Sequence, residues 1–140
     1  MTMSYSVRRT INARPDRVWA LLTDAASYPD WNTAVVSLRG RIGLGEKIKL
    51  VSVVDPKRTF TLKVAELDAP RRMVWASAMP LGLFKGVRTY ELRPNADGGT
   101  EFSIEEVFSG PMAPMITKAI PDLTPSFEQW ADGLKKAAEG

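Results

Sequence analysis

Three side chains able to do acid–base or charge-stabilising chemistry lie on two adjacent predicted strands. Alternating apolar and polar residues predict strands over 86–94 and 100–108. Arg88 and Tyr90 lie on the first strand and Glu106 on the second. A carboxylate or a phenol can transfer a proton, and a guanidinium can stabilise an enolate or hold a carbonyl oxygen. Glu106, Arg88 and Tyr90 are therefore candidate catalytic groups, although the sequence assigns none of them a catalytic role.

The turn between the two strands, Asn-Ala-Asp-Gly-Gly, is the clearest hairpin signal in the chain. Antiparallel partners have position numbers with a constant sum, so a hairpin fixes which residues face one another. With Pro94 opposite Thr100, Arg88 faces Glu106 and Tyr90 faces Ile104. The two charged candidates are thus predicted to be direct neighbours.

The same procedure extends across the earlier hairpins and yields two rows of residues. It predicts that Trp75 and Tyr90 are cross-strand neighbours. The row of Arg88 contains Ser77, Leu62 and Ser52, and the row of Tyr90 contains Trp75, Val64 and Leu50.

Most residues on this face of the predicted sheet are apolar, so it should face the interior: Ile48, Leu50, Phe60, Leu62, Val64, Met73, Trp75, Met79, Leu92, Phe102, Ile104 and Phe108. Charges are almost never buried unless they are paired. Two readings of Arg88 and Glu106 stay open. They form either a structural ion pair or a pair that lines a cavity and binds a ligand oxygen.

The other carboxylates of the strands are less suited to a site. Glu66 shares the inner parity but lies next to a turn, so we expect it at the solvent-exposed rim. Glu91 and Glu105 have the opposite parity and should be surface groups paired with Arg or Lys. A two-carboxylate hydrolase needs both acids in one cavity, and only Glu106 qualifies.

The composition excludes several kinds of chemistry. The chain has 140 residues, 44% of them hydrophobic, and contains neither Cys nor His. Thiol nucleophiles, Ser-His-Asp relays and the usual zinc, copper and haem ligand sets are therefore excluded, and we expect no metal and no cofactor. The length fits a single domain over 1–140.

The formal net charge is +3, but Lys and Arg are dispersed and interleaved with Asp and Glu. Because a surface that follows phosphates needs clustered charge, we expect no nucleic-acid partner. No apolar stretch approaches a membrane span, so no stable membrane insertion is expected. With no leader-like start either, the default expectation is a cytoplasmic protein.

The predicted elements enclose an interior. Strands are expected over 5–13, 34–40, 46–54, 59–67, 72–79, 86–94 and 100–108, separated by turn residues. Pro15 begins a predicted helix that ends near Asp24, and 27–32 is a turn or short helical segment. A helical stripe contains Ile116, Ile120, Leu123, Phe127, Trp130 and Leu134, with a break expected near 119–125 at two prolines. Trp19, Tyr28 and Trp31 are expected to pack the N-terminal helices onto the sheet.

One loop is unusually apolar. Residues 80–86 contain Leu81, Leu83 and Phe84 beside two glycines, Gly82 and Gly86. Burying these side chains would contribute several kcal/mol at about 25 cal/mol per Å². We expect a gate over a cavity mouth, a dimer contact or a transient membrane contact.

The chain resembles the START-like or SRPBCC superfamily, the helix-grip proteins related to polyketide cyclases and plant Bet v 1 allergens. The matching segments, in order, are Val18 to Asp24, Tyr28 to Asn32, Gly99-Thr100, Phe108 to Gly110 and Leu134-Lys135. The resemblance implies an α+β fold in which a seven-stranded antiparallel sheet grips a long C-terminal helix around an apolar cavity, with short helices between strands 1 and 2. Family members bind lipids, sterols, quinones, hormones or polyketides, and only some are catalytic.

Three functions remain open on this basis. The first is binding, transport or sequestration of a small hydrophobic ligand by a monomer or weak homodimer. The second is a polyketide cyclase or dehydratase using the same cavity, and the third is a protein-interaction module. The predicted ligand-binding residues are Trp75, Ser77, Arg88, Tyr90, Glu106, Ile116, Ile120 and Phe127.

Overall fold

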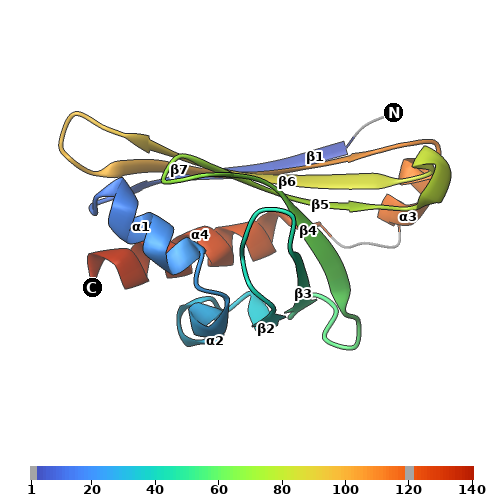
Figure 1. Cartoon of the computed structure of the whole chain (residues 1–140), viewed down its shortest axis with the longest axis horizontal. Helices are drawn as coiled ribbons and strands as arrows, with labels where there is room; N and C mark the ends of the chain where they lie inside the picture. The colour runs from blue at the N-terminus through green and yellow to red at the C-terminus, as the bar shows by residue number, and fades with distance from the viewer. Residues whose placement is uncertain (1–2, 119–121) are drawn as a thin grey trace.

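The computed structural model describes residues 3–118 and 122–140. Figure 1 shows the order of its elements along the chain. The strands are β1 (Met3–Ile11), β2 (Val35–Arg39), β3 (Lys47–Ser52), β4 (Phe60–Asp68), β5 (Arg72–Ala78), β6 (Lys85–Pro94) and β7 (Thr100–Ser109). The α-helices are α1 (Pro15–Leu22), α2 (Tyr28–Trp31), α3 (Ala113–Lys118) and α4 (Thr124–Glu139), with 3₁₀ turns η1 (Ala25–Ser27) and η2 (Pro80–Gly82).

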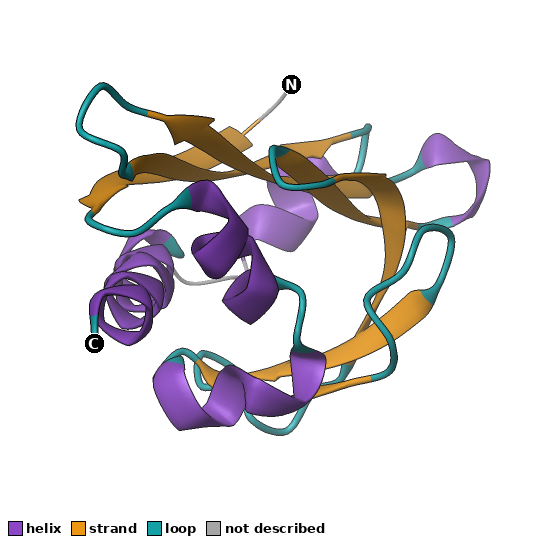
Figure 2. Ribbon diagram, turned by 60° about the vertical axis from the view of Figure 1, so that its left-hand side comes forward, coloured by secondary structure: helices purple, strands orange, loops and turns teal. Residues whose placement is uncertain are grey.

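The strands form one antiparallel sheet in the order β1-β7-β6-β5-β4-β3-β2. Figure 2 shows this sheet curling around the helices, with α4 lying inside the curve. Each strand pairs with its sequence neighbour except β1, which pairs with β7. The predicted helix-grip fold is confirmed, including the short helices between the first two strands.

The helices form where the sequence favours them. Pro15 occupies the first turn of α1, where its missing N–H costs nothing, and Asp16 lies in the same turn. The predicted interruption of the C-terminal stripe is seen as two separate helices, α3 and α4. None of the helices in the described part of the chain is long and apolar enough to cross a bilayer.

The predicted register of β6 and β7 is confirmed. Arg88 lies opposite Glu106, and Tyr90 lies opposite Ile104. Short hairpins with a strong turn signal fix the register closely, because strand twist and turn length are matched there. The pair of charged candidates therefore lies where the sequence predicts it.

The pairing of β5 with β6 differs from the prediction by two residues. Trp75 lies opposite Arg88 rather than Tyr90, and Ser77 lies opposite Gly86 rather than Arg88. The loop causes the difference, since η2 and a backbone hydrogen bond from Met79 N to the oxygen of Phe84 close the hairpin earlier than assumed.

The pairing of β3 with β4 is shifted by four residues. Leu50 lies opposite Phe60, not Val64, and Ile48 lies opposite Leu62. The last residue of β3, Ser52, pairs with Val35 of β2. Because this shift and the shift between β5 and β6 are even, the side chains keep the faces predicted for them.

The inner face is buried as predicted except for half-buried Phe60 and exposed Met79. Met79 lies beyond the end of β5 and is 38% exposed, because the loop turns it away from α4. Glu66 lies at the exposed rim after a β-bulge and pairs with Arg72 at 2.9 Å. Glu91 also pairs with Arg72, at 3.0 Å, and Glu105 is exposed.

Candidate functional site

Arg88 and Glu106 form a buried, two-bond ion pair. The Nε and Nη2 atoms of Arg88 donate to the same oxygen, Oε1 of Glu106, at 2.9 and 2.7 Å. The side chains are only 12% and 9% exposed. Their predicted inward orientation and their contact are therefore both present in the fold, on strands that hold them rigidly.

Aromatic side chains of α4 cover the guanidinium of Arg88. Its Cζ atom lies 4.9 Å from the ring centre of Phe127 and 5.1 Å from that of Trp130. A cation over an aromatic face is stabilised by the ring quadrupole, more strongly where water is excluded. The guanidinium of Arg88 therefore lies where α4 packs against the sheet.

A cluster of four aromatic side chains fills the interior next to the ion pair. Trp75 and Trp130 each contact Tyr90, at ring-centre distances of 4.9 and 5.9 Å. Tyr28 of α2 lies 5.5 Å from Trp130. The residues expected to line a central cavity therefore pack against one another in this structure, and Tyr28 joins them rather than only attaching its helix to the sheet.

Four polar atoms of this region have no hydrogen-bond partner among the described residues. They are Trp75 Nε1, Trp130 Nε1, Arg88 Nη1 and the Tyr90 hydroxyl. Arg88 and Tyr90 interact with each other, so the two indole N–H groups are the donors with no partner at all in the described part of the chain. Each unsatisfied buried polar group costs about 1–3 kcal/mol. Indole and guanidinium nitrogens only donate, so this group of atoms suits an acceptor oxygen.

Burial and charge set the protonation states. Burial raises the pKa of Tyr90 well above its ordinary value, although the nearby Arg88 opposes the shift. Burial disfavours the charged form of Arg88, yet attraction to Glu106 and contact with Tyr90 raise the pKa of Arg88 above its ordinary value. At neutral pH, Tyr90 is a phenol that can donate a proton or hydrogen bond, and Arg88 is a cation.

The surroundings of Gly86, opposite Ser77, are tightly packed. A Cβ atom added at Gly86 would lie 3.3 Å from Ser77 Oγ and 3.4 Å from Oε2 of Glu106, closer than side chains usually pack. Oε2 is the carboxylate oxygen that Arg88 does not bind. Glycine is therefore the residue that fits beside this carboxylate oxygen and hydroxyl without displacing them, at the end of β6 nearest the 80–86 loop.

The three apolar residues of that loop behave differently. Leu81 is 95% exposed and has a left-handed backbone, with φ of 62°. Phe84 instead stacks on Phe108, with ring centres 5.6 Å apart, and Leu83 is half-buried. The backbone of Leu83 also accepts a hydrogen bond from Met112 at 2.9 Å. The loop is therefore fastened to the start of α3, and only its tip is free.

A family model described as polyketide cyclase / dehydrase and lipid transport matches residues 2–139. The chain belongs to this family. The predicted resemblance to START-like, Bet v 1-like proteins is confirmed. A sequence comparison with curated proteins found no match.

Solved structures share the family fold at low sequence identity. The Zhui aromatase/cyclase from Streptomyces sp. R1128 has a TM-score of 0.78 and 16% identity, covering 99% of this chain and 94% of its own. Truncated norcoclaurine synthase from Thalictrum flavum has a TM-score of 0.71 and 17% identity, with 98% and 93% coverage. Ara h 8.0201 has a TM-score of 0.63 and 22% identity, covering 100% of this chain and 97% of its own. These likenesses establish the fold of this family member.

The remaining predicted ligand-binding residues lie near this region or outside the described chain. Phe127 is buried against Arg88, and Ile116 is a half-buried residue of α3. Ile120 lies outside the described residues. The sequence-derived set omits Trp130 and Gly86, although the apolar stripe of α4 and the inward parity of β6 pointed to them.

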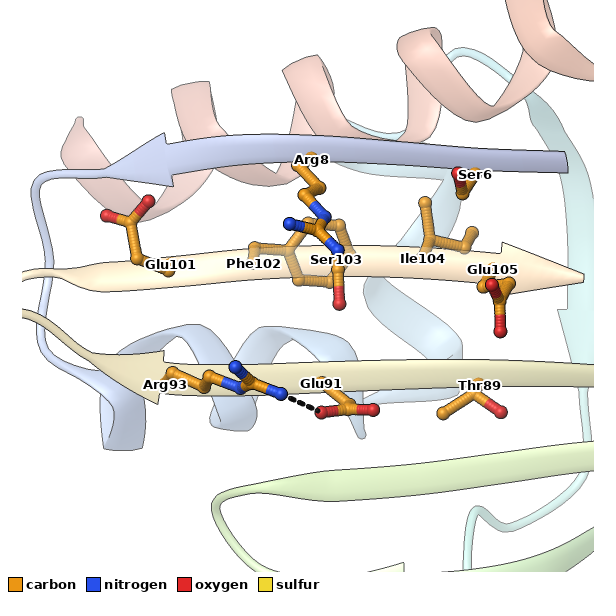
Figure 3. Close-up of a pocket in the computed structure, with 10 residues that line it drawn as sticks. All are labelled: Ser6, Arg8, Thr89, Glu91, Arg93, Glu101, Phe102, Ser103, Ile104 and Glu105. Atoms are coloured by element: carbon orange, nitrogen blue, oxygen red, sulfur yellow. Dashed lines mark hydrogen bonds and ion pairs between the residues drawn. The ribbon is translucent and has the colours of Figure 1, made fainter.

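Two surface hollows lie away from this interior. Figure 3 shows one of about 310 Å³ on the outer face of β1, β7 and β6, where Arg93 pairs with Glu91. Arg8 lies over Ser103 in the same view. The other, of about 600 Å³, lies between α2 and α4 beside Trp31 and Gly133. Neither hollow includes a predicted site residue.

Proposed function

We propose that this protein binds a small hydrophobic molecule carrying an acceptor oxygen, such as a quinone or polyketide ketone. The observation that carries the proposal is the group of unpartnered donors at Trp75, Arg88, Tyr90 and Trp130. A ligand oxygen that accepts from them would remove part of the cost of burying them. The apolar rings around them would bind the rest of the molecule.

The ion pair selects between neutral and charged ligands. The charge of Arg88 is already balanced by Glu106 at 2.7 Å. A ligand carboxylate would bring a second negative charge into a buried site. A neutral carbonyl oxygen can use the free Arg88 Nη1 without that cost, so ketones and quinones fit best.

The ligand body would lie among the aromatic rings of the interior, beside the buried donors. Because the aromatic cluster is close-packed, binding would require Trp130 or Phe127 to change rotamer. Tryptophan emission should therefore change on binding.

A matched pair of probes tests this function. Equilibrium dialysis would compare menadione, a naphthoquinone, with 2-methylnaphthalene, which lacks the oxygens. We expect the quinone to bind at least fivefold more tightly, as one additional hydrogen bond is worth about 1 kcal/mol. Equal affinities for the two probes would overturn the proposal.

Two variants identify the donor. Trp130→Phe keeps an aromatic ring and removes the indole N–H, so it should reduce the preference for the quinone. Trp19→Phe removes an indole from α1 and serves as the matched control. A Trp130→Phe protein that keeps the full preference would show that its N–H is not used.

The second candidate is a cyclase or dehydratase reaction in the same place, favoured by family membership and by Oε2 of Glu106 beside Arg88. Here Oε2 would remove a proton next to a ketone, Arg88 would stabilise the enolate, and the protonated Tyr90 would act as a proton donor. Deuterium exchange at the α-carbon of a bound ketone measures the first step. Glu106→Gln should bind the ketone and lose the exchange, and an unchanged rate would remove this role.

Together with the binding function, we predict a cytoplasmic location, a monomer or weak homodimer, no cofactor and no nucleic-acid partner. A protein-interaction role of Leu81 is the third alternative, since this side chain is 95% exposed. Concentration-dependent sedimentation of the wild type and Leu81→Ser would test it, and identical monomeric behaviour would dismiss it.

A further inference from the structure

The outer surface of β2, β3 and β4 places Lys63 beside three cations that are close together in the sequence. Arg39, Lys47, Lys49 and Lys63 are all exposed and lie on the face opposite the core. We call these four residues the basic face. Figure 2 shows the sheet curling around the helices, so a surface opposite the core lies on the outer side of the curve.

Cations lie directly opposite one another on the basic face. Arg39 pairs with Lys49 across β2 and β3, and Lys47 pairs with Lys63 across β3 and β4. Like charges in directly opposite positions destabilise a sheet. The other outward residues paired with these strands carry no charge to offset the repulsion: Ser37, Val51, Thr61 and Ala76.

Among the described residues, no salt bridge includes a residue of the basic face. Residues 35–52 hold four cations and one carboxylate, a net charge of +3 that equals that of the whole chain. The fold thus concentrates positive charge at this edge of the sheet and leaves it for an external anion.

An apolar side chain protrudes from the same hairpin. Leu44 is 67% exposed in the turn between β2 and β3, and its neighbour Gly45 has φ of 81° and open space around it. The adjacent loop and strand positions hold Arg41 and Lys47. An exposed leucine beside cations is the combination found at surfaces that bind lipid headgroups and insert shallowly.

We propose that the basic face and Leu44 dock the protein on an anionic lipid bilayer. Phosphate headgroups would neutralise the opposed cations, and Leu44 would enter the interfacial layer. A nucleic acid fits less well, because the outward residues of these strands include no aromatic side chain for base stacking and a phosphate backbone offers nothing to Leu44. This docking does not depend on which ligand the interior binds.

The expected strength of vesicle binding follows from the number of cations on the basic face. Each Lys or Arg close to an anionic bilayer strengthens binding about fivefold, so four of them contribute about 600-fold at low salt. Binding should weaken steeply as ionic strength rises, because the charges are exposed. This is the strength of a reversible surface contact rather than an anchor.

Flotation with lipid vesicles is the direct test. Vesicles of equal parts phosphatidylcholine and phosphatidylglycerol should carry the protein upward at 50 mM NaCl and much less at 300 mM, whereas phosphatidylcholine alone should not carry it. Lys47→Gln/Lys49→Gln should bind about 25-fold more weakly. The matched control, Lys118→Gln/Lys136→Gln, loses the same charge from the helices and should bind like the wild type. Equal loss in both double variants would overturn the proposal.

Two further variants separate lipid docking from simpler explanations. Leu44→Ser should weaken vesicle binding and leave any binding to a 20-base-pair duplex unchanged. Lys63→Glu should raise the urea midpoint by placing a carboxylate opposite Lys47, and should weaken vesicle binding. Tight binding to the duplex without binding to the vesicles would replace the lipid with a nucleic acid. A Lys63→Glu protein that still binds vesicles fully would also contradict the proposal.

Discussion

Arg88 donates two hydrogen bonds to a single oxygen of Glu106, at 2.9 and 2.7 Å, and leaves the other oxygen of that carboxylate unused by the guanidinium. This asymmetry places both an ion pair and a free carboxylate oxygen at the same point of the interior. This second oxygen would lie 3.4 Å from a Cβ atom added at Gly86. Glu106 therefore holds Arg88 through one oxygen and keeps its other oxygen available for chemistry.

Removing the carboxylate should cost far more than an ordinary surface change. Glu106→Gln leaves Arg88 buried without its anion, and such losses cost about 3–5 kcal/mol. Urea unfolding measures the change. The double variant Arg88→Met/Glu106→Leu should recover most of the loss, because it buries no unpaired charge. A cost below about 1 kcal/mol for Glu106→Gln would show that the pair is effectively solvated.

Stability should fall in alkaline solution because of the buried tyrosines. Burial raises the pKa of both Tyr28 and Tyr90 in the folded protein. Unfolded tyrosine ionises near pH 10, so above about pH 10 the unfolded state loses protons that the folded state keeps. The stability due to these groups is present below pH 10 and is lost as pH rises towards their folded pKa values.

Each tyrosine contributes a slope of about 1.4 kcal/mol per pH unit in that window. Urea unfolding between pH 9 and 11.5 measures it, and Tyr28→Phe/Tyr90→Phe should flatten the decline. Phenolate absorbance gives a second readout, since these two residues should ionise only on unfolding. If the double variant declines as steeply as the wild type, other groups cause the alkaline loss.

A side chain added at Gly86 should displace the side chains around the ion pair. A Cβ there would lie 3.2 Å from Cε1 of Phe108 and 3.4 Å from Oε2 of Glu106, closer than side chains usually pack. Gly86→Val should therefore lower the urea midpoint and reduce menadione binding severalfold, and Gly86→Ala should do both to a smaller extent. Gly43→Ala is the control, because its Cβ would meet only the side chains of Arg41 and Glu46. Unchanged stability and unchanged menadione binding in Gly86→Val would contradict the packing argument.

The close approach of α2 to α4 depends on Gly133. A Cβ at this position would overlap the backbone oxygen of Trp31, which cannot rotate away. Gly133→Ala should destabilise the protein by about 1–3 kcal/mol, as overpacked sites do. Thermal unfolding beside the tolerated Gly43→Ala provides the comparison, and equal stability of the two variants would refute the packing argument.

The sequence predicts the part of the site that follows from the alternation of side chains along each strand. Arg88 and Glu106 follow from one hairpin with a strong turn signal, and their inward direction follows from parity. The contact of Trp75 with Arg88 instead of direct pairing with Tyr90 depends on how η2 folds the loop, and no local pattern encodes that. The place of Tyr28 in the aromatic cluster depends on the path from α1 to α2, which has no periodicity.

The pairing of cations on the basic face could not be predicted either. The four-residue error in pairing β3 with β4 hides that Lys47 lies opposite Lys63. Arg39, Lys47 and Lys49 are close in the sequence, but only the folded sheet adds Lys63 beside them. An even-numbered register error leaves each side chain on its correct face of the sheet but gives it the wrong cross-strand partner.

Native mass spectrometry of the protein purified from its own host tests the central claim most directly. The account predicts a bound, neutral, oxygen-bearing hydrophobic molecule in the wild type and a lower occupancy in the folded Trp130→Phe variant, which lacks one of the buried donors. The same occupancy in both proteins, or a bound molecule without an acceptor oxygen, would contradict the account.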